Sequence, residues 1–123
     1  FMAMTARLIT WMYGPKFPEK WRDHARDELQ KNAPALLIAD FQACAAFDVY
    51  AALANLSLPT QVICGAVDKM TPLAHNQQLI DAIAQSSLHS IPDCGHMVMR
   101  EAPDAVTALV AAFVNTVAAS SAT

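Results

Sequence analysis

The second half of the sequence alternates short apolar runs with longer helical patterns, and this alternation restricts the possible folds more than any other feature. The run within "LPTQVICGAVD" is too short for a helix and closes at Gly65, which is typical of a buried strand. "SSLHSIP" is predicted to be a second short strand. A helical pattern follows each run, so the order is strand, helix, strand, helix (βαβα). This order predicts an α/β fold with a parallel sheet and a right-handed crossover.

The two helices of this unit have different signals. "TPLAHNQQLIDAIAQ" predicts an N-cap at Thr71 and a proline at the first helical position. From Pro103 onward, apolar residues recur at three- and four-residue steps, which predicts a helix with one buried face. These residues are Val106, Leu109, Val110, Phe113, Val114 and Val117.

The first half of the sequence is predicted to be helical. "FMAMTARLITWMY" is rich in methionine and aromatic residues, as expected of a helix that faces a core or an apolar pocket. "KFPEKWRDHARDELQK" mixes both charge signs and predicts a solvated amphipathic helix. From Pro34 to about Leu56 no breaker interrupts a third helical pattern, which places Leu37, Phe41, Cys44 and Ala45 on one face.

Charge, length and cysteine content exclude several classes of protein. A net charge of -3 provides no basic surface for nucleic acid. No apolar stretch reaches about 20 residues and no leader pattern is present, so we expect a cytoplasmic protein without a membrane partner. Cys44, Cys64 and Cys94 form no C-x-x-C pair and are expected to be reduced, partly buried thiols. At 123 residues the chain is one small domain or a piece of a larger one.

Two residues that follow the predicted strands could act together. Asp68 follows the first strand by a tight turn, and His96 follows the second strand within "IPDCGHMVMREAP". Parallel strands end at the same edge of a sheet, so we expect the two side chains to be neighbours there. A carboxylate that accepts from one ring nitrogen fixes the histidine tautomer and stabilises the imidazolium, as a general base requires. The alternatives are a turn role for Asp68 and a loop role for His96.

No catalytic role is expected for the remaining polar residues. His24 and His89 are expected to be structural or solvated, and His75 to be exposed. Cys94 lacks the elbow or helix N-terminus that activates a nucleophilic thiol. A metal site built from His75, His96 and Asp68 is an alternative, but we do not expect one. Arg100 and Glu101 are expected to form only a surface pair.

Over roughly residues 36 to 116 the sequence resembles the α/β-hydrolase superfamily. The resemblance rests on "FDVYAALANLSLPTQVICGAVDKMTP" and, after a spacer helix, "LHSIPDCGHMVMREAPDAVTALVAAFV". It implies the C-terminal part of a doubly wound parallel sheet, in which Asp68 is the triad acid and His96 the triad base. Residues 1–35 would be a lid-like helical segment, and residues 36–123 the C-terminal half of the hydrolase domain.

The sequence departs from the superfamily pattern in one respect. The nucleophile of the superfamily lies on a G-x-S-x-G elbow, and the three glycines of this chain, Gly14, Gly65 and Gly95, cannot form one. The chain also begins with Phe1 and not with methionine. We therefore expect the C-terminal fragment of a longer enzyme, and expect the chain alone to be inactive.

The resemblance implies a hydrolase that acts on a small apolar ester, lactone or carbon–carbon bond. An upstream serine would be the nucleophile, and no cofactor or metal is implied. The superfamily also includes dehalogenases with an aspartate nucleophile and cofactor-free haloperoxidases, and both alternatives stay open. A different class of function is a non-catalytic module that associates with itself through an uncovered strand edge, as a homodimer.

Overall fold

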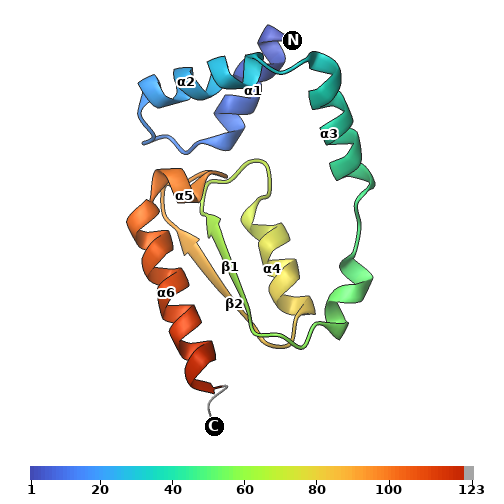
Figure 1. Cartoon of the computed structure of the whole chain (residues 1–123), viewed down its shortest axis with the longest axis vertical. Helices are drawn as coiled ribbons and strands as arrows, with labels where there is room; N and C mark the ends of the chain where they lie inside the picture. The colour runs from blue at the N-terminus through green and yellow to red at the C-terminus, as the bar shows by residue number, and fades with distance from the viewer. Residues whose placement is uncertain (121–123) are drawn as a thin grey trace.

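The centre of the molecule is a two-stranded parallel sheet. The computed structural model describes residues 1–120. Strands β1 (Thr60–Gly65) and β2 (Ser86–Ile91) pair in parallel, with Val62 opposite Leu88. Helix α4 (Leu73–Ala82) connects them, and β2 leads through the short α5 (Val98–Glu101) into α6 (Pro103–Ser120) (Figure 1). The predicted βαβα order and the parallel pairing are confirmed.

Helix α6 does not have the buried face that its sequence predicts. Its 18 residues are long and apolar enough, by length and composition alone, to cross a membrane. No residue of α6 is buried in this structure, although Val106, Leu109, Phe113 and Val117 are partly covered. The helix runs beside the sheet (Figure 1), and the helix that covers a sheet in a larger core passes the same test of length and composition.

The N-terminal quarter forms a helical hairpin above the carboxyl ends of the strands (Figure 1). It consists of α1 (Met2–Met12) and α2 (Glu19–Gln30). Helix α1 buries Leu8 and Ile9, as its apolar composition predicts, whereas α2 buries no residue. The Gln30 amide donates to the hydroxyl of the buried Thr5 at 2.9 Å, which satisfies the polar group between the two helices.

The third predicted helix is shorter than expected. Helix α3 (Pro34–Ala46) ends at an extended Phe47, and a separate 3₁₀ helix, η1 (Tyr50–Asn55), follows. The Asp48 carboxylate accepts the Tyr50 N–H at 2.8 Å. Local side-chain bonds of this kind compete with helical backbone bonds, which explains the break in a sequence without glycine or proline there.

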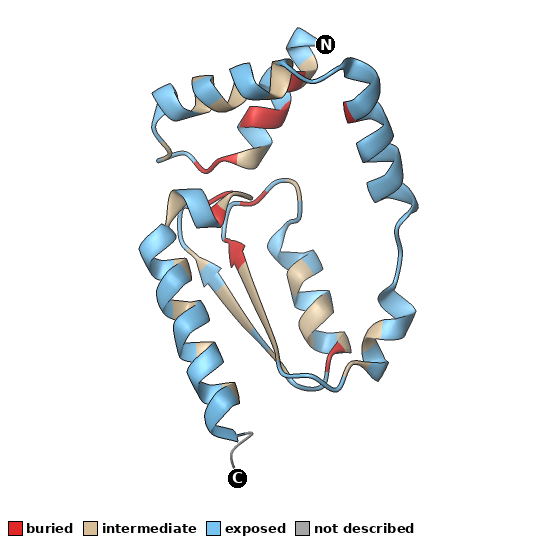
Figure 2. Cartoon of the chain, in the orientation of Figure 1, coloured by how far each residue is buried: buried red, intermediate tan, exposed pale blue. Residues whose placement is uncertain are grey.

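The core is small and lies mainly where the strands end. Buried residues are drawn in red in Figure 2. The apolar ones lie on or just after α1, near the end of β1, and in the loop and short helix after β2, with single residues on α3 and after α4. Of the predicted face of α3, only Leu37 is buried, and Phe41 is 43% exposed. Large apolar side chains on α3, η1 and α6 are exposed as well. The predicted division at residue 35 remains a prediction.

Candidate active site

Asp68 lies in a tight turn directly after β1. Its N–H donates to the Gly65 carbonyl, and its side chain is 3% exposed. One carboxylate oxygen, Oδ1, accepts the backbone N–H groups of Met70 at 2.8 Å and Thr71 at 3.0 Å. The turn therefore fixes the carboxylate from one side and leaves Oδ2 directed toward the neighbouring loop.

His96 comes from that neighbouring loop, which follows β2. Its Nδ1 lies 3.0 Å from Asp68 Oδ2, and its side chain is 36% exposed. The predicted proximity of the two side chains is therefore confirmed. A carboxylate can only accept, so in the neutral ring Nδ1 carries the hydrogen and Nε2 keeps the lone pair. A buried orienting carboxylate beside a partly exposed imidazole is the arrangement that general-base chemistry needs.

Thr71 is a third member of this cluster, although the sequence predicted it to be the N-cap of the following helix. Pro72, and not Thr71, is the N-cap residue of α4, which has no side-chain capping bond. The Thr71 hydroxyl instead donates to Asp68 Oδ2 at 2.8 Å and lies 3.2 Å from His96 Nδ1. Its backbone N–H already binds the same carboxylate, and this short-range turn was the available signal.

The surroundings of Asp68 favour its ionised form. Burial alone would raise the pKa of this carboxyl group. The hydrogen bonds from the Thr71 backbone, the His96 ring, the Thr71 hydroxyl and the Met70 backbone outweigh that effect and hold the pKa below its ordinary value. The group therefore stays a carboxylate near neutral pH and can stabilise a positive charge on the imidazole.

Comparisons with known proteins agree with this geometry. No protein-family profile matches the chain. A 2-hydroxy-6-oxononadienedioate/2-hydroxy-6-oxononatrienedioate hydrolase from Klebsiella pneumoniae is 36% identical over 61 residues, which are 50% of this chain and 21% of the relative. A thermophilic esterase superposes with a TM-score of 0.82 at 26% identity, over 94% of this chain and 46% of the esterase. The chain has the fold of the C-terminal part of an α/β hydrolase.

A second esterase shows the same α/β-hydrolase fold at lower identity. The enzyme from Exiguobacterium antarcticum has a TM-score of 0.82 at 17% identity, and the match covers 93% of this chain and 42% of the esterase. The resemblance inferred from the sequence is thereby confirmed. The chain spans less than half the length of either esterase and matches about a fifth of the curated relative.

Within this α/β-hydrolase fold, Arg100 and Glu101 do not pair with each other. The Arg100 guanidinium donates to the Tyr13 hydroxyl at 3.0 Å. The Glu101 carboxylate accepts the backbone N–H of Gly14 at 2.7 Å and that of Gly95 at 2.9 Å. The expectation of a surface pair was wrong, because the α1–α2 loop supplies partners that are distant in sequence.

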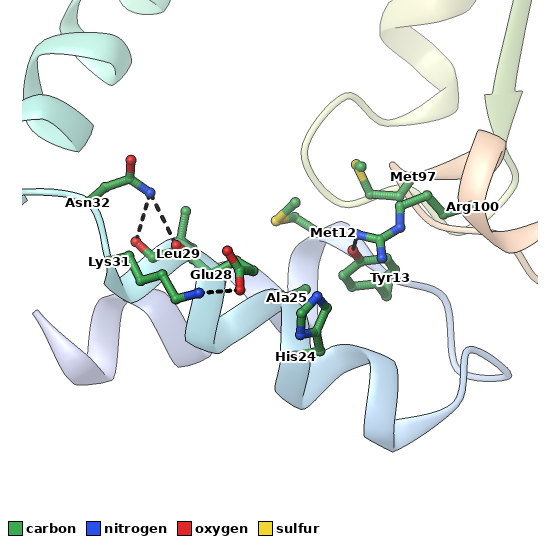
Figure 3. Close-up of a pocket in the computed structure, with 10 residues that line it drawn as sticks. All are labelled: Met12, Tyr13, His24, Ala25, Glu28, Leu29, Lys31, Asn32, Met97 and Arg100. Carbon is green, nitrogen blue, oxygen red and sulfur yellow. Dashed lines mark hydrogen bonds and ion pairs between the residues drawn. The ribbon is translucent and has the colours of Figure 1, made fainter.

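The other candidate residues lie apart from the Asp68–His96 pair. His75 is exposed on α4, and His89 is half-buried in β2 opposite Ile63. The loop of residues 92–97, which follows β2 and carries His96, is called the histidine loop below. His24 lines an open hollow of about 520 Å³ between α2 and this loop, together with Arg100 (Figure 3). Among residues 1–120, no group of three or more histidine, cysteine or acidic side chains is placed to hold a metal.

The cysteines of the described chain are free thiols with different exposure. Cys64 and Cys94 are buried, and Cys44 is exposed on α3, contrary to the expectation of partial burial. Burial raises the pKa of both buried thiols, and the carboxylates of Glu101 and Asp93 raise that of Cys94 further. A thiol with a raised pKa is a poor nucleophile near neutral pH, so Cys94 is not suited to attack a substrate.

Proposed function

We propose that the chain supplies the acid and the base of a hydrolase's catalytic triad. The 3.0 Å contact between buried Asp68 Oδ2 and partly exposed His96 Nδ1 carries the proposal. In this mechanism, His96 Nε2 removes the proton from a serine hydroxyl while the serine oxygen attacks the substrate. The imidazolium then protonates the leaving group, and Asp68 stabilises the positive charge in between.

The serine and the oxyanion-binding groups would come from residues outside these 123. None of the three glycines can form the elbow on which the superfamily carries its nucleophile. The match covers 46% of the thermophilic esterase, so more than half of that enzyme has no counterpart here. Proton transfer between serine, histidine and the leaving group needs no organic cofactor.

The proposed substrate is a small apolar ester, a lactone, or a compound that is cleaved at a carbon–carbon bond. The names of the relatives, two esterases and a dienedioate hydrolase, support a hydrolytic reaction, and the apolar character of the substrate rests on the fold. The structure also contains an apolar hollow of about 210 Å³, which borders the turn of residues 68–71 at Met70. Its lining residues are Leu8, Met12, Leu29, Leu37, Asp40, Phe41, Cys44 and Met70. A hollow lined in this way favours an uncharged substrate group.

Complementation tests this function. The chain is mixed with the part of the thermophilic esterase that it does not match, and hydrolysis of 4-nitrophenyl acetate is followed. We expect no turnover from the chain alone and measurable turnover from the mixture. Asp68→Asn should lower that turnover by about 10⁴-fold, since loss of the orienting carboxylate leaves the histidine in the wrong tautomer. Turnover that survives His96→Ala in the mixture would refute the assignment of the base.

The alternative is a module that associates with itself, and the open sheet favours it. Among the described residues the sheet contains only β1 and β2, so each strand has one edge without a strand partner. Apolar side chains such as Phe47 and Val114 are more than half exposed. Soluble proteins normally cover such edges and surfaces. Sedimentation equilibrium at low micromolar concentration should therefore show a homodimer, and a single species at the 13.3 kDa monomer mass would contradict it.

A further inference from the structure

We infer that Glu101 is a positioning residue that joins the α1–α2 loop to the histidine loop and thereby holds the His96 ring in place. The inference rests on the proposed function, because it concerns the same base. Glu101 Oε1 accepts the Gly95 N–H at 2.9 Å, and Oε2 accepts the Gly14 N–H at 2.7 Å. One side chain thus binds the residue just before His96 and a residue 87 positions away in sequence.

Only a carboxylate satisfies both partners at this position. Each N–H requires an acceptor, and a carboxylate has two acceptor oxygens. The amide of glutamine has a single acceptor oxygen, and its NH₂ group would face the second N–H. Bonds from backbone N–H groups to a charged oxygen are stronger than neutral ones. The contact region is partly buried, which reduces the competition from water.

Neighbouring contacts hold the same two loops together. The Met97 N–H donates to the Met12 carbonyl at 3.1 Å. Lys16 Nζ lies 2.6 Å from Asp93 Oδ2 at the exposed margin. A β-carbon on Gly95 would lie 2.6 Å from the Gly14 nitrogen, so the two backbones touch directly. The segment that carries His96 is therefore fixed on both sides by the N-terminal hairpin.

This arrangement connects Glu101 to the chemistry through Gly95. The Gly95 N–H fixes the backbone at the point where the chain enters His96. The His96 ring must stay 3.0 Å from Asp68 for its Nδ1–H to be shared with the carboxylate. A displacement of about 1 Å would break that bond, since a polar contact near 4 Å is no hydrogen bond. Outer partners of this kind orient catalytic side chains without touching the substrate.

NMR spectroscopy of the ¹⁵N-labelled 123-residue chain tests the inference without a nucleophile. Glu101→Gln should remove one of the two backbone bonds and Glu101→Ala both. We expect hydrogen exchange at Gly14 or Gly95 to accelerate about tenfold or more in the first variant, and at both residues in the second. The ¹⁵N shifts of the His96 ring should show a graded loss of the Nδ1–H tautomer in the same order. Glu28→Gln, which neutralises an exposed carboxylate paired with Lys31 and distant from the histidine loop in sequence, is the matched control and should change neither signal.

Three outcomes would overturn the inference. The first is unchanged exchange at both glycines in Glu101→Ala. The second is fast exchange with an unchanged His96 tautomer, which would make Glu101 a purely structural residue. The third is loss of the folded state in both variants. Asp68→Asn separates the two proposals: if it leaves the His96 tautomer unchanged, the proposed acid–base pair fails, whatever the Glu101 variants show.

Discussion

The carbonyl oxygen of Gly95 lies against Gly65, so that a β-carbon on Gly65 would be only 2.0 Å from it. The end of β1 and the histidine loop therefore meet backbone to backbone. Gly14 also lies against Gly95, since a β-carbon on Gly95 would be 2.6 Å from the Gly14 nitrogen, so Gly95 contacts both other glycines of the chain. Asp68 follows Gly65 and His96 follows Gly95, so this close backbone contact helps to keep their side chains within hydrogen-bonding distance.

Gly65→Ala should destabilise the protein. The added methyl group would meet backbone oxygens of Gly95 and Cys94, which cannot rotate away as a side chain can. We expect the free energy of unfolding, measured in urea, to fall by about 1 to 3 kcal/mol, as for other overpacked sites. Ala111→Ser, which adds one atom at an exposed position of α6, is the control. Equal effects of the two substitutions would contradict the close backbone contact.

Thr71→Val should weaken the turn of residues 68–71 while preserving the size of the side chain. Valine cannot donate to Asp68 Oδ2, so the carboxylate loses a partner that now lies at 2.8 Å. We expect a loss of about 1 kcal/mol in the free energy of unfolding. Thr71→Ser keeps the hydroxyl group and should stay close to the parent protein. A valine variant as stable as the parent protein would show that this hydrogen bond contributes nothing to stability, because valine lacks only the hydroxyl group.

Acid should remove the stability that Asp68 contributes. Its pKa in the folded protein lies below the ordinary value, because its hydrogen bonds outweigh the effect of burial. A group with a lowered folded-state pKa stabilises the fold above its unfolded pKa of about 4, and this stabilisation is lost as the pH falls through the folded pKa. The gap in unfolding free energy between the parent protein and Asp68→Asn should therefore narrow from pH 5 to pH 3. A difference in unfolding free energy that widens as the pH falls would show that the folded-state pKa of Asp68 is raised and not lowered.

Alkylation should distinguish the three cysteines. Cys44 is exposed, whereas burial raises the pKa of Cys64 and Cys94 and reduces the thiolate that reacts. With iodoacetamide at pH 8, mass spectrometry of the native protein should find one rapid adduct, on Cys44. In denaturant all three should react. Native labelling of Cys94 as fast as that of Cys44 would show that the histidine loop is open.

The strands and the acid–base pair were predictable because their signals are local. The first strand is a short apolar run that closes at Gly65, and the second is a short segment closed by Pro92. A helical pattern follows each of them. Parallel pairing then brings the residues after both strands to one edge, so the proximity of Asp68 and His96 followed from their order alone. The end of α3 was not predictable in this way, because the Asp48 side-chain bond replaces a helical one without a breaker residue.

Tertiary structure alone decided how the pair is held. Thr71 looked like a helix cap because a threonine before a proline can cap, but the carboxylate of Asp68 offers its hydroxyl a charged acceptor. Glu101 binds Gly14 across 87 residues, and no local pattern specifies a contact over that separation. A glycine in a sequence permits another backbone segment to approach closely, but it does not indicate which segment that is. The sequence by itself determined which residues reach the edge of the sheet, and the packing of the N-terminal hairpin on the histidine loop decided their support.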